Sequence, residues 1–198
     1  MAESGLTAVS GKAPRRGWRS RLDGLQRADP GNVESMLESL LEKDLFFMRE
    51  ALHQAETAAS HDEVPVGCLI TLEDRILAKA YNQVELLKDP TAHAEMIAIT
   101  QASHSLSCKW LTDCTMFVTV EPCSMCAGAL VLARVKRLCF GAFDEKAGAC
   151  GSVCNIVQSD RLNHRLDVQG GVMADACGGL MSEFFEKKRL RPSLQERI

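Results

Sequence analysis

The segment TMFVTVEPCSMCAGALVLARVKRLCFGA, residues 115–142, carries the pattern that decides the fold of this chain. Its two ends, residues 115–120 and 135–142, are short runs rich in apolar and β-branched side chains, which are typical of buried strands. Between them, Pro122 opens a segment that continues to about residue 133 and is predicted to be a helix, because proline is favoured in the first helical turn. The segment therefore predicts a strand, a helix and a second strand in succession.

Two more strands are predicted on the N-terminal side of this unit, at residues 64–71 and 75–81. The short turn at Glu73 and Asp74 favours a hairpin between them. A helix is predicted before the hairpin, beginning near Asp44, which is a suitable N-cap residue. The apolar residues that follow it at helical spacing are Leu45, Met48, Leu52 and Ala55.

The remaining elements are predicted from the same signals. A helix is expected over residues 92–102, following Pro90, and a late strand over residues 166–172. Residues 174–189 are expected to form the final helix. Because strands and helices alternate after an opening hairpin, the sequence predicts a layered α/β domain over residues 43–198.

Residues 1–42 are expected to be a disordered N-terminal extension. Gly, Ser, Pro and Arg dominate the first part, and almost no apolar periodicity appears before Val33. Within the extension, residues 33–41 are expected to form at most a short helix. An organelle transit peptide would also be rich in arginine, but three acidic residues and few serines in residues 1–30 weaken that alternative.

The overall charge and cysteine content limit the function classes. The net charge of −3 means that a nucleic-acid partner would need a local basic patch. The nine cysteines are an odd number, and no signal-peptide core precedes them, so a cytoplasmic location is expected, where thiols stay reduced. No segment reaches the roughly 20 apolar residues that a membrane span needs, so no membrane association is expected.

Two short motifs carry the chemistry. The first is TAHAE, which contains His93 and Glu95, and the second is EPCSMC, which contains Cys123 and Cys126. Imidazole nitrogen and thiolate sulfur are the ligands that Zn²⁺ prefers. Two cysteines at the start of a helix and one histidine make three protein ligands, which leaves a fourth tetrahedral position open to water, as in a catalytic site.

Glu95 is expected to move protons rather than to bind the metal. It lies two residues beyond His93, and residues i and i+2 of a helix point in different directions. A carboxylate near an activated water but outside the ligand set is suited to general acid–base work.

Each motif has other interpretations. Taken alone, Cys-x-x-Cys is equally typical of a redox pair or of half a structural zinc site. A structural site would need a fourth ligand, and the six other cysteines show no second paired spacing. The combination of both motifs, each at the start of a predicted helix, therefore favours the catalytic interpretation.

The pairing of His-x-Glu with Pro-Cys-x-x-Cys is the signature of the zinc-dependent cytidine and adenosine deaminase superfamily. Within it, the chain resembles the bacterial tRNA-specific adenosine deaminases from about residue 44 to about residue 189. The segments that carry this resemblance are residues 63–67, 82, 89–95, 120–123, 125–129, 141–142, 151–152, 163–165 and 184–185.

The resemblance implies a three-layer α/β/α cytidine-deaminase-like fold with a central five-stranded mixed sheet. It implies hydrolytic deamination of adenosine to inosine at the wobble position of a tRNA anticodon by a homodimer. It also implies one Zn²⁺ per subunit, held by His93, Cys123 and Cys126, with Glu95 as the proton shuttle.

Three substrate-binding residues are carried over from the same resemblance. Asn82 matches a residue that contacts the target nucleoside, Asp144 one that contacts the flanking nucleotide, and Phe185 an aromatic near the anticodon loop. The alternatives are a turn residue for Asn82, a solvated loop acid for Asp144 and core packing for one ring of the Phe184–Phe185 pair.

The chain departs from the family pattern at two positions. Phe143 and Glu186 stand where basic residues are usual, and both changes remove positive charge near the expected RNA path. The rival functions are deamination of a free base or nucleotide, an editing subunit that works in a heterodimer, and a non-catalytic RNA-binding protein. The intact Glu95 argues against the last of these.

Overall fold

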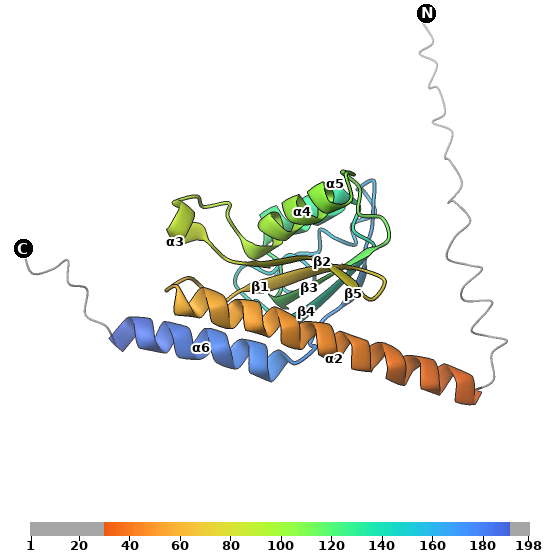
Figure 1. Ribbon diagram of the computed structural model, residues 1–198, viewed down its shortest axis with the longest axis horizontal. Coiled ribbons are helices and arrows are strands. Elements are labelled where there is room, and N and C mark those ends of the chain that lie inside the picture. Colours follow the sequence, from red (N-terminus) through yellow and green to blue (C-terminus); the bar gives the residue numbers. More distant parts are fainter. Residues whose placement is uncertain (1–29, 191–198) are drawn as a thin grey trace, which may run out of the picture. The chain divides into compact units, whose positions relative to one another are not determined.

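A mixed sheet of five strands lies at the centre of the computed structural model, which describes residues 30–190 (Figure 1). The strand order is β2-β1-β3-β4-β5. β1 is antiparallel to both β2 and β3, whereas β4 is parallel to β3 and to β5. The strands are β1 (Gly67–Leu72), β2 (Arg75–Tyr81), β3 (Cys114–Val120), β4 (Arg137–Ala142) and β5 (Asp167–Gln169).

Helices cover both faces of the sheet, which confirms the three-layer architecture that the resemblance implied. The chain divides after residue 41 into two units, and the sheet lies in the second. Within this second unit, α4 (Ala94–Ser105) and α5 (Ser124–Ala133) lie above the sheet in Figure 1. The part of α2 (Pro30–Ser60) that begins at residue 42 lies below it with α6 (Ala174–Leu190), and the short α3 (Val84–Leu87) follows β2.

Two apolar clusters hold the layers together, one on each face of the sheet. Because successive side chains of a strand point to opposite faces, neighbours in β1, β3 and β4 enter different clusters. The cluster under α4 and α5 includes Ile70, Val118, Phe140, Ala98 and Leu130. The cluster against α2 and α6 includes Leu69, Phe117, Cys139, Met48 and Cys177.

The first helix begins earlier than the sequence predicted. α2 starts at Pro30, so Asp44 lies inside the helix and the prediction of an N-cap there is wrong. The Asp44 carboxylate instead accepts two hydrogen bonds from the guanidinium of Arg137, of 2.7 and 2.6 Å, and so joins α2 to the first residue of β4. A local capping signal cannot be distinguished by sequence from a long-range ion pair.

The earlier start also changes the predicted extension. Residues 30–42, which the composition assigned to a disordered segment, are helical, and the short helix predicted at 33–41 is part of α2. The rest of that expected extension, residues 1–29, lies outside the described residues.

Most other boundaries agree with the predictions to within three residues. β2 spans the predicted residues 75–81. β5 is shorter than predicted and ends before Gly170, with Gly171 at a φ of 87°. The sequence missed α3, because four residues are too few to show a helical period. None of the helices in residues 30–190 is long and apolar enough to cross a membrane.

Gly67, the first residue of β1, allows α2 to approach the sheet closely. A Cβ atom there would collide with backbone atoms of Ala51 and Ala55 in α2. We expect Gly67→Ala to lower the free energy of unfolding by about 2 kcal/mol or more, because rigid backbone cannot yield as a side chain can. Urea denaturation measures this change.

Gly179→Ala is the matched control for this substitution. Gly179 is exposed in α6, and a Cβ added there would meet nothing within 4 Å. Since alanine has the higher helix propensity, this variant should gain up to about 1 kcal/mol. A Gly67→Ala protein as stable as the wild type would contradict the close approach of the α2 backbone to β1.

Candidate active site

Three strands end at the same edge of the sheet and deliver the residues of the site. β2 and β3 are both antiparallel to β1, so they run the same way, and β4 is parallel to β3. Their carboxyl ends are followed by Asn82, Glu121 and Phe143. The crevice outside the carboxyl ends of parallel strands is the usual ligand site of open α/β sheets.

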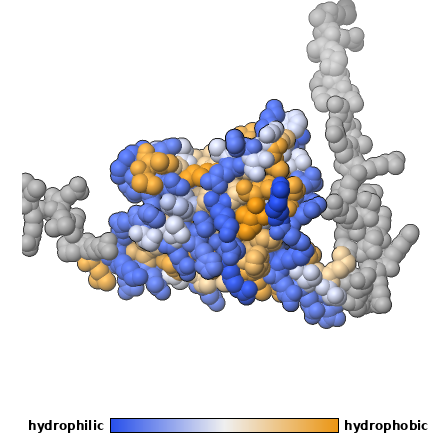
Figure 2. Space-filling view, viewed as in Figure 1, coloured by the Kyte–Doolittle hydropathy of each residue, from blue (hydrophilic) through white to orange (hydrophobic). Residues whose placement is uncertain are grey.

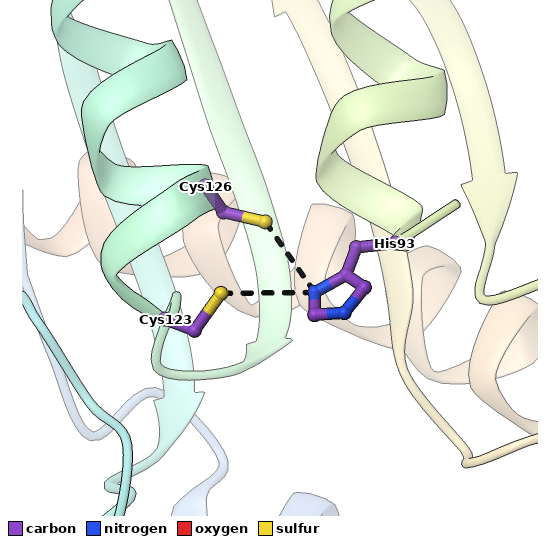
Figure 3. A group of neighbouring side chains, drawn as sticks. All are labelled: His93, Cys123 and Cys126. Carbon is purple, nitrogen blue, oxygen red and sulfur yellow. Dashed lines mark hydrogen bonds between the residues drawn. The ribbon is translucent and has the colours of Figure 1, made fainter. Parts of the chain in front are cut away.

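His93 and Cys123 occupy equivalent positions at the starts of two helices. His93 is the N-cap of α4 and Cys123 the N-cap of α5, both with extended backbone and neither with a side-chain capping bond. Cys126 lies in the first turn of α5, three residues on. Figure 3 shows the three side chains pointing toward one another from the two helix ends.

The spacing of these donor atoms suits a tetrahedral metal ion. Nδ1 of His93 lies 3.7 Å from Sγ of Cys123 and 3.6 Å from Sγ of Cys126. All three donors lie within 4.8 Å of one another. Zn–S and Zn–N bonds of usual length at a tetrahedral angle would separate such donors by about 3.6 Å. The donor set and its geometry therefore fit a zinc ion.

The two thiols differ in protonation when no metal binds them. Hydrogen bonds from Cys126 and from His93 lower the pKa of Cys123 to about 3, so its sulfur is a thiolate at neutral pH. The same bond to Cys123, together with burial, raises the pKa of Cys126. The hydrogen bond to Cys123 also raises the pKa of His93, against a smaller opposing effect of burial.

Glu95 is the one buried acid at the site with an unsatisfied oxygen. It lies in the first turn of α4 and is 4% exposed. Its Oε2 has no hydrogen-bond partner among the described residues. Burial raises the pKa of this carboxyl. Because a buried polar atom normally has a partner, the free oxygen indicates a place for water or substrate.

A cleft of about 330 Å³ opens over these groups. Among the residues predicted for the site, it is lined by Asn82, His93, Glu95, Cys123 and Asp144. Cys126 is buried and is not part of the lining, although its sulfur is directed at His93. Residues that sequence reasoning assigned no role also line the cleft, among them Glu63, Glu121 and Met181.

Glu121 organises the wall that carries Asp144. Its carboxylate accepts hydrogen bonds from the backbone N–H groups of Asp144 at 3.1 Å, Cys150 at 2.9 Å and Ser152 at 3.0 Å, and from the Ser152 hydroxyl. Although burial raises the pKa of Glu121, these bonds lower it below its ordinary value. The signal in the sequence was an acid directly after a buried strand.

Part of what Asp144 does agrees with the alternative interpretation, that of a loop acid. Its Oδ1 accepts hydrogen bonds from the backbone of Lys146 and Ala147, at 2.9 and 3.1 Å, and so stabilises its own turn. The residue also lines the cleft.

The aromatic residues near the site have different environments. Phe184 is 8% exposed, which confirms core packing for one ring of the pair, and Phe185 beside it is 41% exposed but does not line the cleft. Phe143 is 59% exposed, with its ring packed edge-on against buried Phe140 at a centroid distance of 5.1 Å. Glu186 is exposed on α6.

Comparison with known proteins agrees with this geometry. A family model of MafB19-like deaminases matches residues 42–189. The tRNA-specific adenosine deaminase of Bacillus subtilis is 42% identical over 159 residues, which cover 78% of this chain and 99% of that protein. The protein of the same name from Aquifex aeolicus is 47% identical over 144 residues, covering 73% of this chain and 95% of that protein. This chain belongs to the tRNA-specific adenosine deaminase family.

Solved structures place the deaminase in the same fold. One, from work on A-to-I editing by tRNA:A34 deaminases at the wobble position of transfer RNA, superposes with a TM-score of 0.66 at 37% identity, over 68% of this chain and 98% of that one. A guanine deaminase from Nitrosomonas europaea shares the fold at a TM-score of 0.62 and 22% identity, over 69% of this chain and 81% of that one.

The unequal thiols predict how metal affinity depends on pH. Above the pKa of His93, Cys123 is already a thiolate and binding must remove one proton, from Cys126, so the affinity of the site for Zn²⁺ should rise about tenfold per pH unit. Below the raised pKa of His93, a second proton must leave and the dependence should steepen. Competition with a chromophoric chelator measures both slopes.

Cys150→Ala provides the control for this titration. Burial raises the pKa of the Cys150 thiol, but the residue lies outside the cluster of three donors. The variant should keep the wild-type slope. An affinity that does not change with pH would contradict a protonated Cys126.

Proposed function

We propose that this deaminase converts adenosine to inosine at the wobble position of a tRNA anticodon by hydrolysis. The observation that carries the proposal is the buried, unsatisfied Oε2 of Glu95 in a cleft that also contains two of the three metal-binding donors. The choice of substrate is supported by relatives at 42% and 47% identity that are named tRNA-specific adenosine deaminases.

We propose that His93, Cys123 and Cys126 hold one Zn²⁺ per subunit. The support is the chemistry of the donors and their separations of 3.6 and 3.7 Å. When bound, the ion supplies Lewis-acid activation of a water molecule at neutral pH. Cys123 enters this arrangement already ionised, and the starts of both helices favour negative charge on the sulfurs.

Glu95 performs the proton transfers of the reaction. Its free Oε2 accepts a proton from the water that adds to C6 of adenine. The same carboxyl passes this proton to the ring nitrogen, then takes the proton that remains on the added hydroxyl group and passes it to the departing amine, so that water and adenosine become inosine and ammonia. One residue can act first as base and then as acid because burial raises the pKa of its carboxyl, so that the group can both take up and release a proton.

We propose that residues in the loops after β2 and β4, together with a residue of α6, bind the RNA. Asn82 contacts the target base, Asp144 contacts the flanking nucleotide, and Phe185 lies near the rest of the anticodon loop. The support is that Asn82 and Asp144 both line the cleft and that the Phe185 ring is exposed. The target base is unstacked from its loop to enter the cleft.

We also propose a homodimer in the cytoplasm. The dimer is supported by the family resemblance, and the location by the tRNA substrate and by nine cysteines that are all free. Sedimentation equilibrium should give twice the chain mass of 21.7 kDa. A monomer that is fully active would contradict the proposed assembly.

Replacement of the proposed proton shuttle gives the sharpest test of the mechanism. Glu95→Gln keeps the shape of the side chain but removes its proton transfer, so kcat on an anticodon stem-loop should fall about 10³-fold or more while zinc remains bound. Inosine is scored by mass. Glu56→Gln, an exposed acid on α2, is the matched control and should keep wild-type turnover.

Substrate choice is tested with the zinc-loaded wild-type protein. It should convert adenosine at the wobble position of a synthetic anticodon stem-loop and leave free bases and nucleosides largely unchanged. Absence of conversion by a folded, zinc-loaded protein, together with turnover of a free base, would replace the proposed function with small-molecule deamination.

A further inference from the structure

Glu63 is a buried acid at the cleft for which the proposed chemistry has no use. Glu63 lies in the loop between α2 and β1. Its side chain is fully buried, at 0% exposure, and is part of the cleft lining. It precedes β1 by four residues, yet every hydrogen bond of its carboxylate goes to the segment after β2. Burying a carboxylate costs free energy unless its oxygens accept hydrogen bonds, so the partners of Glu63 show which part of the chain it holds.

The carboxylate holds the side chain of Asn82 directly. Nδ2 of Asn82 donates a hydrogen bond of 3.0 Å to Oε2 of Glu63. Because an ionised carboxylate only accepts hydrogen bonds, this contact determines which end of the amide faces Glu63. The Oδ1 atom and the second Nδ2 proton of Asn82 then remain for whatever enters the cleft.

The same carboxylate also fixes the backbone that follows. It accepts hydrogen bonds from the N–H groups of Glu85 at 3.1 Å and of Leu86 at 2.6 Å. These groups lie in the first turn of α3, whose N-cap residue Gln83 makes no side-chain capping bond. Glu63 therefore caps α3 from a distant part of the chain and holds Asn82 and α3 as one unit.

α3 has little apolar packing of its own. α3 contains no buried residue, and its Leu86 and Leu87 are exposed, as the apolar surface over α3 in Figure 2 shows. Little apolar packing therefore keeps the segment in place. Three hydrogen bonds to Glu63 attach the segment to the wall of the cleft, beside the backbone bonds from Asn82 to Val66 and from Gln83 to Ala92.

We infer that Glu63 is a positioning residue, which orients the amide of Asn82 toward the substrate base and holds α3 at the edge of the cleft. The inference rests on the proposed function, because it assigns Asn82 to the target base. Glu63 acts on the substrate only through Asn82 and the segment that follows it.

Glu121 is the matched comparison within the same molecule. It is also a buried acid of the cleft, with four hydrogen bonds to the opposite wall. None of those bonds involves Asn82. Replacing either acid by glutamine removes a charge and weakens a wall, but only the change at Glu63 should alter the orientation of Asn82.

The first measurement detects the contact without any substrate. In zinc-loaded, ¹⁵N-labelled protein, the side-chain amide of Asn82 is assigned by its loss in Asn82→Ala. Its protons should exchange slowly with solvent in the wild type, and both the shift and the protection should change in Glu63→Gln but not in Glu121→Gln. An unchanged Asn82 resonance in a folded Glu63→Gln protein would overturn the inference.

The second measurement is a double-mutant cycle on deamination of the stem-loop. Glu63→Gln should lower kcat/KM about tenfold when Asn82 is present and less than about twofold in the Asn82→Ala background, because the two residues act as one unit. Glu121→Gln should lower kcat/KM by the same factor in both backgrounds. Equal losses from Glu63→Gln in both backgrounds would show a merely structural role and would overturn the inference.

The two measurements separate this inference from the proposed function. A wild-type protein that converts no stem-loop makes the proposed function wrong, whereas the resonance of Asn82 still decides the contact with Glu63. If Glu63→Gln does not fold, Glu63→Asp takes its place in both experiments, since it keeps the charge but shortens the reach to Asn82 and α3.

Discussion

β1 runs against both of its neighbours in the sheet, and this single reversal makes β2, β3 and β4 point the same way. Their carboxyl ends therefore meet at one edge, where the chain leaves the sheet three times in succession. Two of these exits are followed by the helices α4 and α5, at whose starts the proposed metal ligands lie. The site depends on this parallel arrangement, because it brings residues 82, 93, 123 and 144, which are far apart in the sequence, to the same edge of the sheet.

Three buried acids at that edge illustrate a common physical problem with two solutions. Burying a carboxylate costs free energy unless hydrogen bonds replace its lost water. Glu63 and Glu121 are satisfied by N–H and O–H donors on opposite walls, and they thereby order the loops that form the cleft. Glu95 keeps one oxygen without a partner among the described residues, which is the property that a proton shuttle needs.

The success of the sequence predictions differed with the range of the interaction. Strands and helices with a clear period, such as β2 and α6, were found close to their observed bounds. The start of α2 was placed fourteen residues too late, because the role of Asp44 depends on Arg137, which lies far away in the sequence. α3 was missed for a related reason, since its cap comes from Glu63 and not from a neighbouring residue.

For this protein the sequence by itself determined the chemistry of the site. The types and spacing of His93, Glu95, Cys123 and Cys126 are local patterns, and metal-ligand preference is a property of the donor atoms themselves. Only the tertiary structure decided which oxygen of which acid is free, and which acids hold the walls. Those distinctions depend on hydrogen bonds between residues 19 to 31 positions apart, which chain folding creates and no local pattern records.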